Sequence, residues 1–253
     1  MTLDLFRLDG RVALVTGGDK GLGRAIAIGL AQAGAGVAIV SRSGHNAATL
    51  AAILAAGRRG LGLTFDVGRP ESAEQIVTQT IQQLGRLDIL VNNAGTIRRA
   101  AAAETTLEDF SAVLDVNLTG LWALSQAAGR VMLTRGGGKI INIASVLTFQ
   151  GGIRVPAYTA SKHAVAGLTK ALANEWAGQG VNVNAIAPGY METDNTQALR
   201  DDPQRSRQIL ERIPAGRWGA PDDLIGAAVF LASRASDYVH GHVLVVDGGW
   251  LAR

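Results

Sequence analysis

The sequence predicts an α/β fold in which a parallel sheet is covered by helices on both sides. Strand and helix patterns alternate along the chain, and the strands are apolar on both faces, which is typical of a sheet buried between two helical layers. Seven short apolar runs have the length of such strands: residues 12–15, 37–40, 61–65, 87–91, 139–144, 181–187 and 243–246. We therefore predict a doubly wound sheet in three layers, with ligands bound at the carboxyl ends of its strands.

Helices are predicted between these strands, where apolar residues recur every three or four positions. The first follows the glycine-rich residues 17–23, the second spans residues 47–56, and the third includes residues 76–84. Thr106 is expected to cap a long helix together with Asp109. Pro156 precedes a helix that runs to about residue 177, and Pro221 opens the last one.

Residues 190–220 form the longest stretch without a predicted element, and they are largely polar. Loops of this length in compact domains are usually functional or mobile, so we expect a substrate-loop region here. No proline- or serine-rich linker interrupts the 253 residues, and a chain of this length can bury a substantial core. We expect a single domain over residues 1–253.

The composition excludes several classes of function. The chain has no cysteine, which excludes disulfides and thiolate metal sites, and the histidine pair His240 and His242 has no further ligand nearby in sequence, so we expect no metal. The net charge of +3 arises from scattered Lys and Arg, so no nucleic-acid partner is expected. No apolar run can span a bilayer and the first residues lack a signal pattern, so we expect a cytoplasmic protein without membrane contact.

The segment that joins the first strand to the first helix carries three spaced glycines, Gly17, Gly21 and Gly23. Glycines let the backbone approach a phosphate closely, and the unpaired N–H groups of the following helix point at it. The literal G-x-G-x-x-G fingerprint is absent. By itself the segment therefore leaves dinucleotide binding and an ordinary turn equally open.

Tyr158 and Lys162 are four residues apart on a predicted helix, so they share one face. The pKa of a free tyrosine is about 10, and a neighbouring cation lowers it toward the range needed for acid–base catalysis. Ser145 follows the strand at residues 139–144 and has a hydroxyl that can polarise a carbonyl. Taken alone, this spacing of Tyr and Lys also arises by chance on a helix surface.

Together, these features resemble the short-chain dehydrogenase/reductase family, whose fold is Rossmann-like, and the resemblance covers essentially the whole chain. The motifs that carry it are, in chain order, Thr16-Gly17-x-x-x-Gly21-x-Gly23, Asn92-Asn93-Ala94-Gly95, Asn117, Ser145, Tyr158-x-x-x-Lys162 and Pro188-Gly189.

The resemblance implies hydride transfer between nicotinamide C4 and a secondary alcohol or ketone. Tyr158 would be the general acid/base, and Lys162 would lower its pKa and hold the nicotinamide ribose. Ser145 would bind the substrate oxygen, and Asn117 would anchor a water of the proton relay. The positions implied to bind the cofactor are Gly17, Asp19, Lys20, Gly21, Leu22, Gly23, Ser41, Arg42, Asp66, Val67, Asn93, Ala94, Gly95, Tyr158, Lys162, Pro188, Gly189 and Thr193.

The charges at the predicted adenosine end favour NADP(H). Sites for NAD place an acidic residue at the end of the second strand. Here that position is Ser41, followed by Arg42, and Lys20 precedes the second glycine of the loop. Two cations without a carboxylate suit a 2′-phosphate, although NAD(H) remains possible if both cations point into solvent. The family resemblance also implies a homotetramer, with the long helices from about residues 106 and 157 at one interface.

A closer resemblance lies between residue 149 and the C-terminus. The runs FQGGIRVPAYTASK, NVNAIAPGYMETDNTQ, RIPAGRWG and VDGGWLAR resemble the 2-dehydro-3-deoxy-D-gluconate 5-dehydrogenases of pectin and uronate breakdown, with gluconate 5-dehydrogenases and 2-deoxy-gluconate 3-dehydrogenases as near neighbours. The implied substrate is a small sugar acid, whose carboxylate needs a cation. The implied substrate residues are Ser145, Gln150, Arg154 and Tyr158, with Arg98 as a second candidate for the carboxylate.

Two other functions stay open at this point. The first is a reductase of 3-oxoacyl thioesters, which would need a basic docking patch for a carrier protein. The second is a dinucleotide-binding sensor that has lost catalysis. The presence of Asn117, Ser145, Tyr158 and Lys162 together argues against the sensor, because a sensor has no need of a proton relay.

Overall fold

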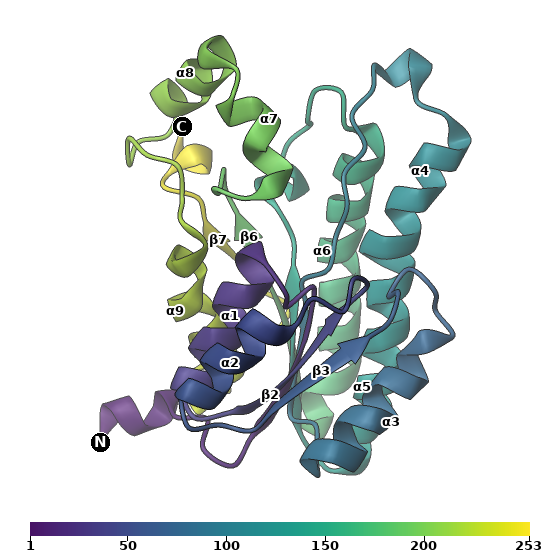
Figure 1. Cartoon of the computed structure of the whole chain (residues 1–253), viewed down its shortest axis with the longest axis vertical. Coiled ribbons are helices and arrows are strands. Elements are labelled where there is room, and N and C mark those ends of the chain that lie inside the picture. Colours follow the sequence, from purple (N-terminus) through teal and green to yellow (C-terminus); the bar gives the residue numbers. More distant parts are fainter.

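The computed structural model describes residues 1–253 and contains one parallel sheet in the order β3-β2-β1-β4-β5-β6-β7. All seven predicted strands are present, each within two residues of its predicted bounds. They are β1 (Val12–Thr16), β2 (Gly36–Ser41), β3 (Gly60–Thr64), β4 (Ile89–Asn92), β5 (Gly138–Ile143), β6 (Val181–Pro188) and β7 (Val243–Val246). Figure 1 shows the strands with their carboxyl ends at the top of the view.

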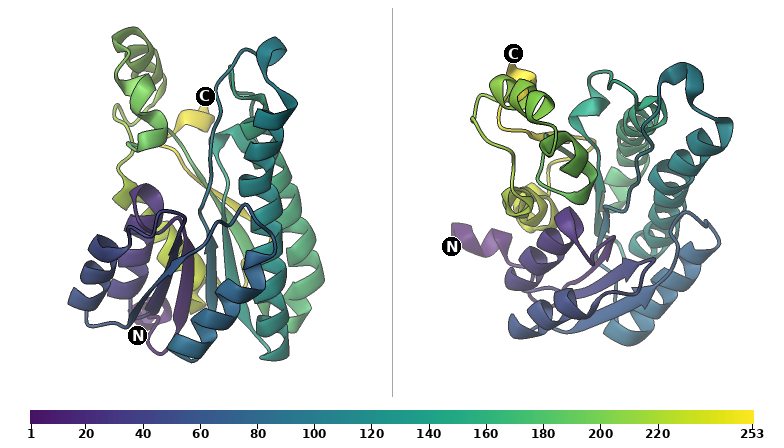
Figure 2. Two further views of the ribbon diagram at one scale, coloured as in Figure 1. Left: turned by 45° about the vertical axis from the view of Figure 1, so that its right-hand side comes forward. Right: turned by 45° about the horizontal axis from the view of Figure 1, so that its top comes forward.

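Helices cover both faces of the sheet and give three layers (Figure 2). On one face, α1 (Gly21–Gln32), α2 (Ala47–Ala55) and α9 (Ile225–Ala232) pack against the strands. On the other face lie α3 (Ser72–Leu84), α4 (Leu107–Leu114), α5 (Leu121–Thr134) and α6 (Pro156–Trp176). The predicted Rossmann-like doubly wound fold is therefore confirmed. No helix combines the length and the apolar character needed to cross a membrane.

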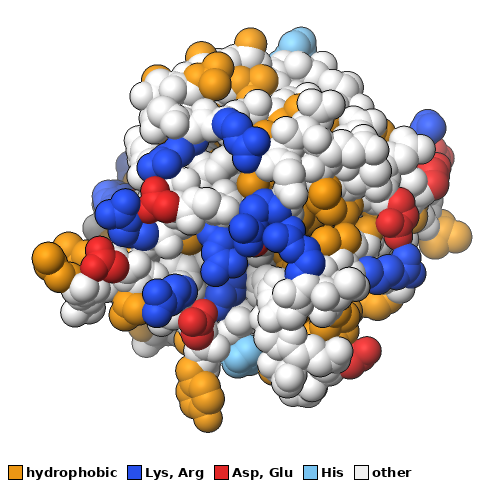
Figure 3. Space-filling view, turned by 90° about the horizontal axis from the view of Figure 1, so that it is seen from below, with side chains coloured by type: hydrophobic (Ala, Val, Ile, Leu, Met, Phe, Trp, Pro, Cys, Tyr) orange, Lys and Arg blue, Asp and Glu red, His pale blue; other side chains and the backbone are white.

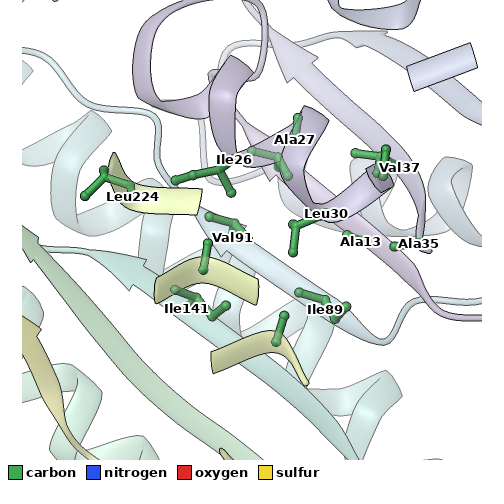
Figure 4. Close-up of a cluster of buried hydrophobic side chains, with 14 of the residues drawn as sticks. Ala13, Ile26, Ala27, Leu30, Ala35, Val37, Ile89, Val91, Ile141 and Leu224 are labelled. Atoms are coloured by element: carbon green, nitrogen blue, oxygen red, sulfur yellow. The ribbon is translucent and has the colours of Figure 1, made fainter. Parts of the chain in front are cut away.

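The alternation of side chains along each strand fills two separate cores. In β1, Ala13 and Val15 belong to the core beneath α1 and α9, whereas Val12 and Leu14 belong to the core beneath α3, α5 and α6. Figure 4 shows part of the first core, in which side chains from α1 meet those from the central strands. Because both faces of these strands are buried, the strands read as continuous apolar runs in the sequence.

The sheet reverses its winding direction at β1 and β4. Val15 of β1 pairs with Ile39 of β2 on one side and with Val91 of β4 on the other. The chain runs outward from β1 through β2 to β3, then crosses back to β4 and continues outward to β7. The connections that leave the carboxyl ends of β1 and β4 therefore diverge, and they leave a crevice between them.

The long helix predicted from Thr106 is interrupted by one wider turn. Thr106 Oγ1 accepts a hydrogen bond from the Asp109 N–H at 3.1 Å, so the predicted cap is present. Between α4 and α5, residues Asp115–Gly120 form a π-helix. Gly120 faces the backbone of Val67, and a Cβ there would lie 2.0 Å from the Val67 carbonyl oxygen. Such π-turns are frequent at functional sites, and this one contains Asn117.

The expectation that residues 190–220 form a loop was wrong in part, because they contain α7 (Gln197–Arg200) and α8 (Pro203–Arg212). Asp202 caps α8 by accepting hydrogen bonds from two backbone N–H groups at 3.0 Å each. One face of α8 buries Ile209 in a small cluster with Trp218 and Trp250. These helices escaped prediction because they are short and largely polar, and some of their apolar partners, such as Val146 and Trp250, lie far away in sequence. They stand above the carboxyl ends of β6 and β7 (Figure 1).

Candidate active site

The loops after β1 and β4 are fixed to each other by the side chain of Thr16. Its Oγ1 accepts hydrogen bonds from the N–H groups of Asn93 at 3.0 Å and Ala94 at 2.9 Å. In return, Asn93 Nδ2 donates to the carbonyl oxygens of Thr16 and Gly17. Gly17 has φ +62°, and a Cβ on Gly23 would lie 2.1 Å from the Gly17 carbonyl oxygen. Only glycine fits at either position, so the sequence itself produces this tight turn.

A cleft of about 850 Å³ opens at the carboxyl ends of β1, β2 and β4. Its volume falls within the usual range for small-molecule and cofactor sites. Fifteen of the eighteen positions predicted to bind the cofactor line it, namely Gly17, Asp19, Lys20, Gly21, Leu22, Ser41, Arg42, Asp66, Val67, Asn93, Ala94, Gly95, Tyr158, Lys162 and Thr193. Segments from across the sequence therefore meet in one elongated site.

The other three predicted cofactor positions lie behind this lining. Gly23 packs beneath the loop against the Gly17 carbonyl, as described above. Pro188 is buried at the end of β6. A Cβ on Gly189 would lie 2.6 Å from the Cα of Asp247, so Gly189 serves the close packing of β6 against the segment that follows β7. In this structure these residues shape the chain around the cleft.

Lys162 is buried without a carboxylate partner. Its side chain lies one turn beyond Tyr158 on α6, with Nζ 5.5 Å from the centroid of the tyrosine ring. The residue is 4% exposed, and Nζ donates a hydrogen bond to the Ile143 carbonyl at 2.6 Å. Burial disfavours the ammonium ion and lowers the pKa of Lys162 to about 8. The cation is thus anchored by the end of β5, at the inner end of the cleft.

Burial raises the pKa of Tyr158 above its ordinary value, while a hydrogen bond with the Ser145 side chain and the charge of Arg99 both act to lower it. Ser145 follows β5 and is 8% exposed, and its Oγ also accepts a hydrogen bond from the Leu147 N–H at 3.1 Å. The sequence assigned the lowering of the tyrosine pKa to Lys162. In the structure, Ser145 and Arg99 act to lower it, and the effect of Lys162 on the phenol stays a prediction.

Asn117 links the loop after β4 to helix α6. Its Oδ1 accepts a hydrogen bond from the Thr96 N–H at 2.8 Å, and its Nδ2 donates to the Thr96 carbonyl at 3.0 Å. The same Nδ2 donates to Ser161 Oγ at 3.1 Å, and that hydroxyl donates to the Tyr158 carbonyl at 2.7 Å. Sequence reasoning missed Ser161, although a serine directly before Lys162 in the motif was the available signal. The π-turn thus holds the backbone of the tyrosine in place.

The two cations predicted at the adenosine end differ in their surroundings. Lys20 Nζ lies 2.6 Å from Asp194 Oδ2, and this hydrogen bond raises the pKa of Lys20 and lowers that of Asp194. Arg42 has no such carboxylate partner and is exposed on the lining of the cleft. A third cation, Arg69, lines the same cleft after β3 and was missed by sequence reasoning. Because Lys20 is paired with Asp194, Arg42 and Arg69 are left as cations without an ion-pair partner in the cleft, which is also lined by the unpaired Asp19, Asp66 and Asp115.

Ser41, at the end of β2, is buried and has a structural partner on each side. Its hydroxyl donates to Asn46 Oδ1 at 2.8 Å and accepts from the Gly44 N–H at 3.1 Å. These bonds hold the turn that carries Arg42. The second strand thus ends in Ser41, at the position where sites for NAD place an acidic residue.

Of the two arginines predicted to bind a substrate carboxylate, Arg98 lines the cleft together with Tyr158, whereas Arg154 does not. Arg98 Nε lies 3.8 Å from Asp109 Oδ1, and its side chain is 62% exposed. Arg154 is exposed, has φ +62°, and accepts a hydrogen bond from the Ala100 N–H through its carbonyl oxygen at 3.1 Å. The cation whose charge acts on Tyr158 is instead Arg99.

Arg99 is held between the loop after β4 and the segment after β6. Its Nη2 donates to the Asn195 carbonyl at 2.7 Å, and its charge also lowers the pKa of Tyr190 against the raising effect of burial. Gln150, another predicted substrate residue, is partly buried and accepts a hydrogen bond from Arg212 Nη2 at 3.3 Å. The Arg212 guanidinium stacks 4.0 Å from the centroid of the Trp250 ring. Helix α8 is thereby tied to the loop that precedes α6.

Known proteins share this architecture over nearly the full chain. The family model described as enoyl-(acyl carrier protein) reductase matches residues 17–251. The 2-dehydro-3-deoxy-D-gluconate 5-dehydrogenase of Bacillus subtilis (strain 168) is 56% identical over 250 residues, which cover 99% of this chain and 98% of the relative.

Two solved structures are similarly close. One from Agrobacterium tumefaciens with bound NADP is 56% identical, with a TM-score of 0.94 and coverage of 99% of this chain and 100% of the other. A gluconate 5-dehydrogenase from Burkholderia cenocepacia J2315, in complex with NADP and tartrate, is 43% identical, with a TM-score of 0.96 and full coverage of both chains. The match to the family model, the full-length relatives and the cleft above Tyr158 and Lys162 lead to one conclusion: the chain belongs to the short-chain dehydrogenase/reductase family of NAD(P)-dependent oxidoreductases.

Proposed function

We propose that this protein interconverts a secondary alcohol and a ketone of a small sugar acid, of the 2-dehydro-3-deoxy-gluconate or gluconate type, with NADP(H) as the hydride carrier. The observation that carries the proposal is the surroundings of Tyr158. The Ser145 side chain hydrogen-bonds to the phenol, and the charge of Arg99 acts on the same group. Nζ of the buried Lys162 lies 5.5 Å from the centroid of the tyrosine ring. The names of the similar proteins support the choice of a sugar acid.

The cleft fits a dinucleotide in its chemistry. The tight glycine turn presents the N-terminus of α1, where a pyrophosphate is stabilised by unpaired N–H groups. Arg42 and Arg69 provide the cations that suit a 2′-phosphate. When bound, the nicotinamide would supply or accept the hydride at the end of the cleft that Tyr158 and Lys162 line.

Each residue around the phenol has a distinct part in moving the proton. In ketone reduction, the Tyr158 hydroxyl donates its proton to the substrate oxygen, and in alcohol oxidation the phenolate accepts it. The Ser145 hydroxyl donates a hydrogen bond to the same oxygen. The Lys162 ammonium stabilises negative charge on the phenolate, and Asn117 keeps the tyrosine backbone in position through Ser161.

We propose Arg99 as the partner of the substrate carboxylate. Arg99 acts electrostatically on both Tyr158 and Tyr190, so its charge lies between the reacting phenol and the segment after β6. A guanidinium binds a carboxylate through two parallel hydrogen bonds and so fixes its orientation. The helices α7 and α8 in residues 190–220 would cover the sugar and exclude water.

A substrate panel tests this function. We expect the highest kcat/KM with 2-dehydro-3-deoxy-D-gluconate or gluconate, and a much lower value with an uncharged polyol of similar size. An acetoacetyl thioester serves as the third arm, because the description of the matching family model names acyl carrier protein. A higher kcat/KM with the thioester would overturn the proposal, and no turnover with any arm would favour a sensor.

Cofactor preference gives a second test at Arg42. If its guanidinium binds the 2′-phosphate, Arg42→Ala should raise the KM for NADP(H) about 10- to 100-fold, the equivalent of one charge-assisted hydrogen bond, with little change for NAD(H). Lys20→Ala is the matched control, because the Lys20 charge is already paired with Asp194. Equal or better kcat/KM of the wild type with NAD(H) would contradict the preference.

The predicted homotetramer remains a separate proposal. Trp122 on α5 is 37% exposed on the outer face of the helical layer that contains α6, and burial of such a side chain by a second copy is favourable. We expect light scattering to give four times the 26.3 kDa chain mass. A mass of 26.3 kDa in solution would contradict it.

A further inference from the structure

A second hollow lies at the opposite edge of the sheet from the cofactor cleft. Its volume is about 560 Å³, and none of its lining residues is shared with the cleft. Its walls come from the amino ends of β1, β4, β5 and β6 and from the turn after α9. We call it the amino-end pocket and define it by its six cations, Arg7, Arg11, Arg86, Arg135, Lys139 and Arg234.

Basic side chains dominate the face of the molecule that contains this pocket. Figure 3 shows Lys and Arg side chains gathered at the centre of that face, with acidic side chains around them. The pocket is also lined by four aspartates. Whether it attracts anions therefore depends on which cations these aspartates already neutralise.

Three of the aspartates are paired with basic side chains, and two of them have two such partners: Asp88 pairs with Arg86 and Arg11, and Asp9 pairs with Arg7 and Arg58. Asp88 is 5% exposed and accepts two hydrogen bonds of 2.6 Å from Arg86, plus one from the Val12 N–H. Asp237 accepts from Lys139 at 2.8 Å. Asp9 accepts from Arg7 at 2.7 Å.

The fourth aspartate, Asp4, pairs with the N-terminal ammonium at 2.6 Å. Two of the six cations consequently remain without a carboxylate partner, and a third shares its aspartate. Arg135 and Arg234 have no hydrogen-bond or ion-pair partner, and Arg11 reaches Asp88 only at 3.5 Å. Their positive charges come from three different segments and converge on one hollow.

Lys139 and Arg11 lie close enough in the amino-end pocket for their charges to affect each other. The Lys139 side chain is only 13% exposed, and burial lowers its pKa, while Asp237 acts to raise it and Arg11 to lower it further. Like charges that influence each other in a partly desolvated hollow are stabilised by an anion that screens both.

From this arrangement we propose that the amino-end pocket binds a small molecule with two or more adjacent anionic groups, such as a diphosphate. Guanidinium groups bind phosphate and carboxylate oxygens through paired hydrogen bonds, and the unpaired Arg135 and Arg234, with Arg11 in the same pocket, can engage more than one such group. A single monovalent anion balances only one of the two unpaired charges. The site is separate from the cofactor cleft, so both ligands bind at the same time.

Isothermal titration calorimetry on the NADP-saturated protein tests the proposal, because the cofactor then occupies the other phosphate site. Inorganic pyrophosphate is the first probe and citrate the second, which separates phosphate from carboxylate chemistry. We expect at least one of them to bind with a Kd below about 1 mM at low salt, and binding to weaken as salt is raised. Orthophosphate should bind at least tenfold more weakly.

The decisive variant is Arg135→Gln/Arg234→Gln, which removes two exposed side chains without breaking any ion pair. We expect its Kd for the bound probe to rise at least tenfold. Arg24→Gln/Lys170→Gln is the matched control, since both residues are exposed and lie outside the pocket, and its Kd should stay within twofold of the wild type. Unchanged kcat in both variants shows that they fold. Absence of binding to the wild type, or equal binding by the pocket variant, overturns the proposal.

Discussion

Replacing Tyr158 with Phe should lower kcat by about 10²–10⁴-fold, the usual contribution of general acid–base catalysis. The substitution removes only the phenol oxygen, while the ring keeps its place beside Lys162. The Kd for NADP(H) should therefore change little. Steady-state turnover with a sugar acid and fluorescence titration of the cofactor measure the two quantities separately.

Tyr238→Phe is the matched control, because that residue is fully exposed and distant from the cleft. It should leave both kcat and cofactor binding unchanged. If Tyr158→Phe retained near wild-type kcat, the proton would have to come from another group, and the assignment of Tyr158 would fail.

Replacing Arg99 with Ala should lower kcat/KM for a sugar acid about 10- to 100-fold, since a hydrogen bond to a charged group contributes roughly 1.5–3 kcal/mol. An uncharged alcohol has no carboxylate to lose, so its kcat/KM should fall much less. Arg98→Ala is the comparison from the neighbouring position, because Arg98 also lines the cleft but pairs with Asp109, and its loss should be smaller. Arg154→Ala tests the alternative partner, and a larger charge-selective loss there than at Arg99 would move the carboxylate to the loop before α6.

Arg99→Ala should also change the pH dependence of alcohol oxidation. The reaction needs the Tyr158 phenolate, so activity rises with pH through the pKa of that group. Arg99 acts to lower this pKa, and its removal should shift the rising limb to higher pH. Arg99→Lys keeps the charge and should restore the pH profile while it leaves the carboxylate less well oriented. An unchanged profile in Arg99→Ala would mean that the charge does not reach the phenol.

The sequence by itself determined the fold of this protein and most of its cofactor cleft. Strands buried on both faces must be apolar throughout, so their number, their order along the chain and their approximate bounds can be predicted from the sequence. The tight turn at Gly17 and Gly23 excludes side chains, and such a turn is visible as spaced glycines. These features depend on residues close in sequence, or on a simple burial rule, and they need no knowledge of distant contacts.

Helices α7 and α8 could not be predicted from the pattern of apolar residues. These helices have few apolar side chains. Ile209 is buried because Trp218 and Trp250, from outside the helix, pack against it. A short polar segment with one apolar residue per turn reads as a loop when that partner surface is unknown.

Only the tertiary structure decided which charges act where. Arg98 and Arg99 are indistinguishable as sequence, yet the path of their loop directs one toward Asp109 and the other toward Asn195 and Tyr158. Lys20 is neutralised by Asp194, a residue 174 positions away, and the two unpaired arginines of the amino-end pocket, Arg135 and Arg234, come from separate segments. Charge interactions depend on distance in space and on local solvent exposure, and for residues far apart in sequence the folded chain alone sets both.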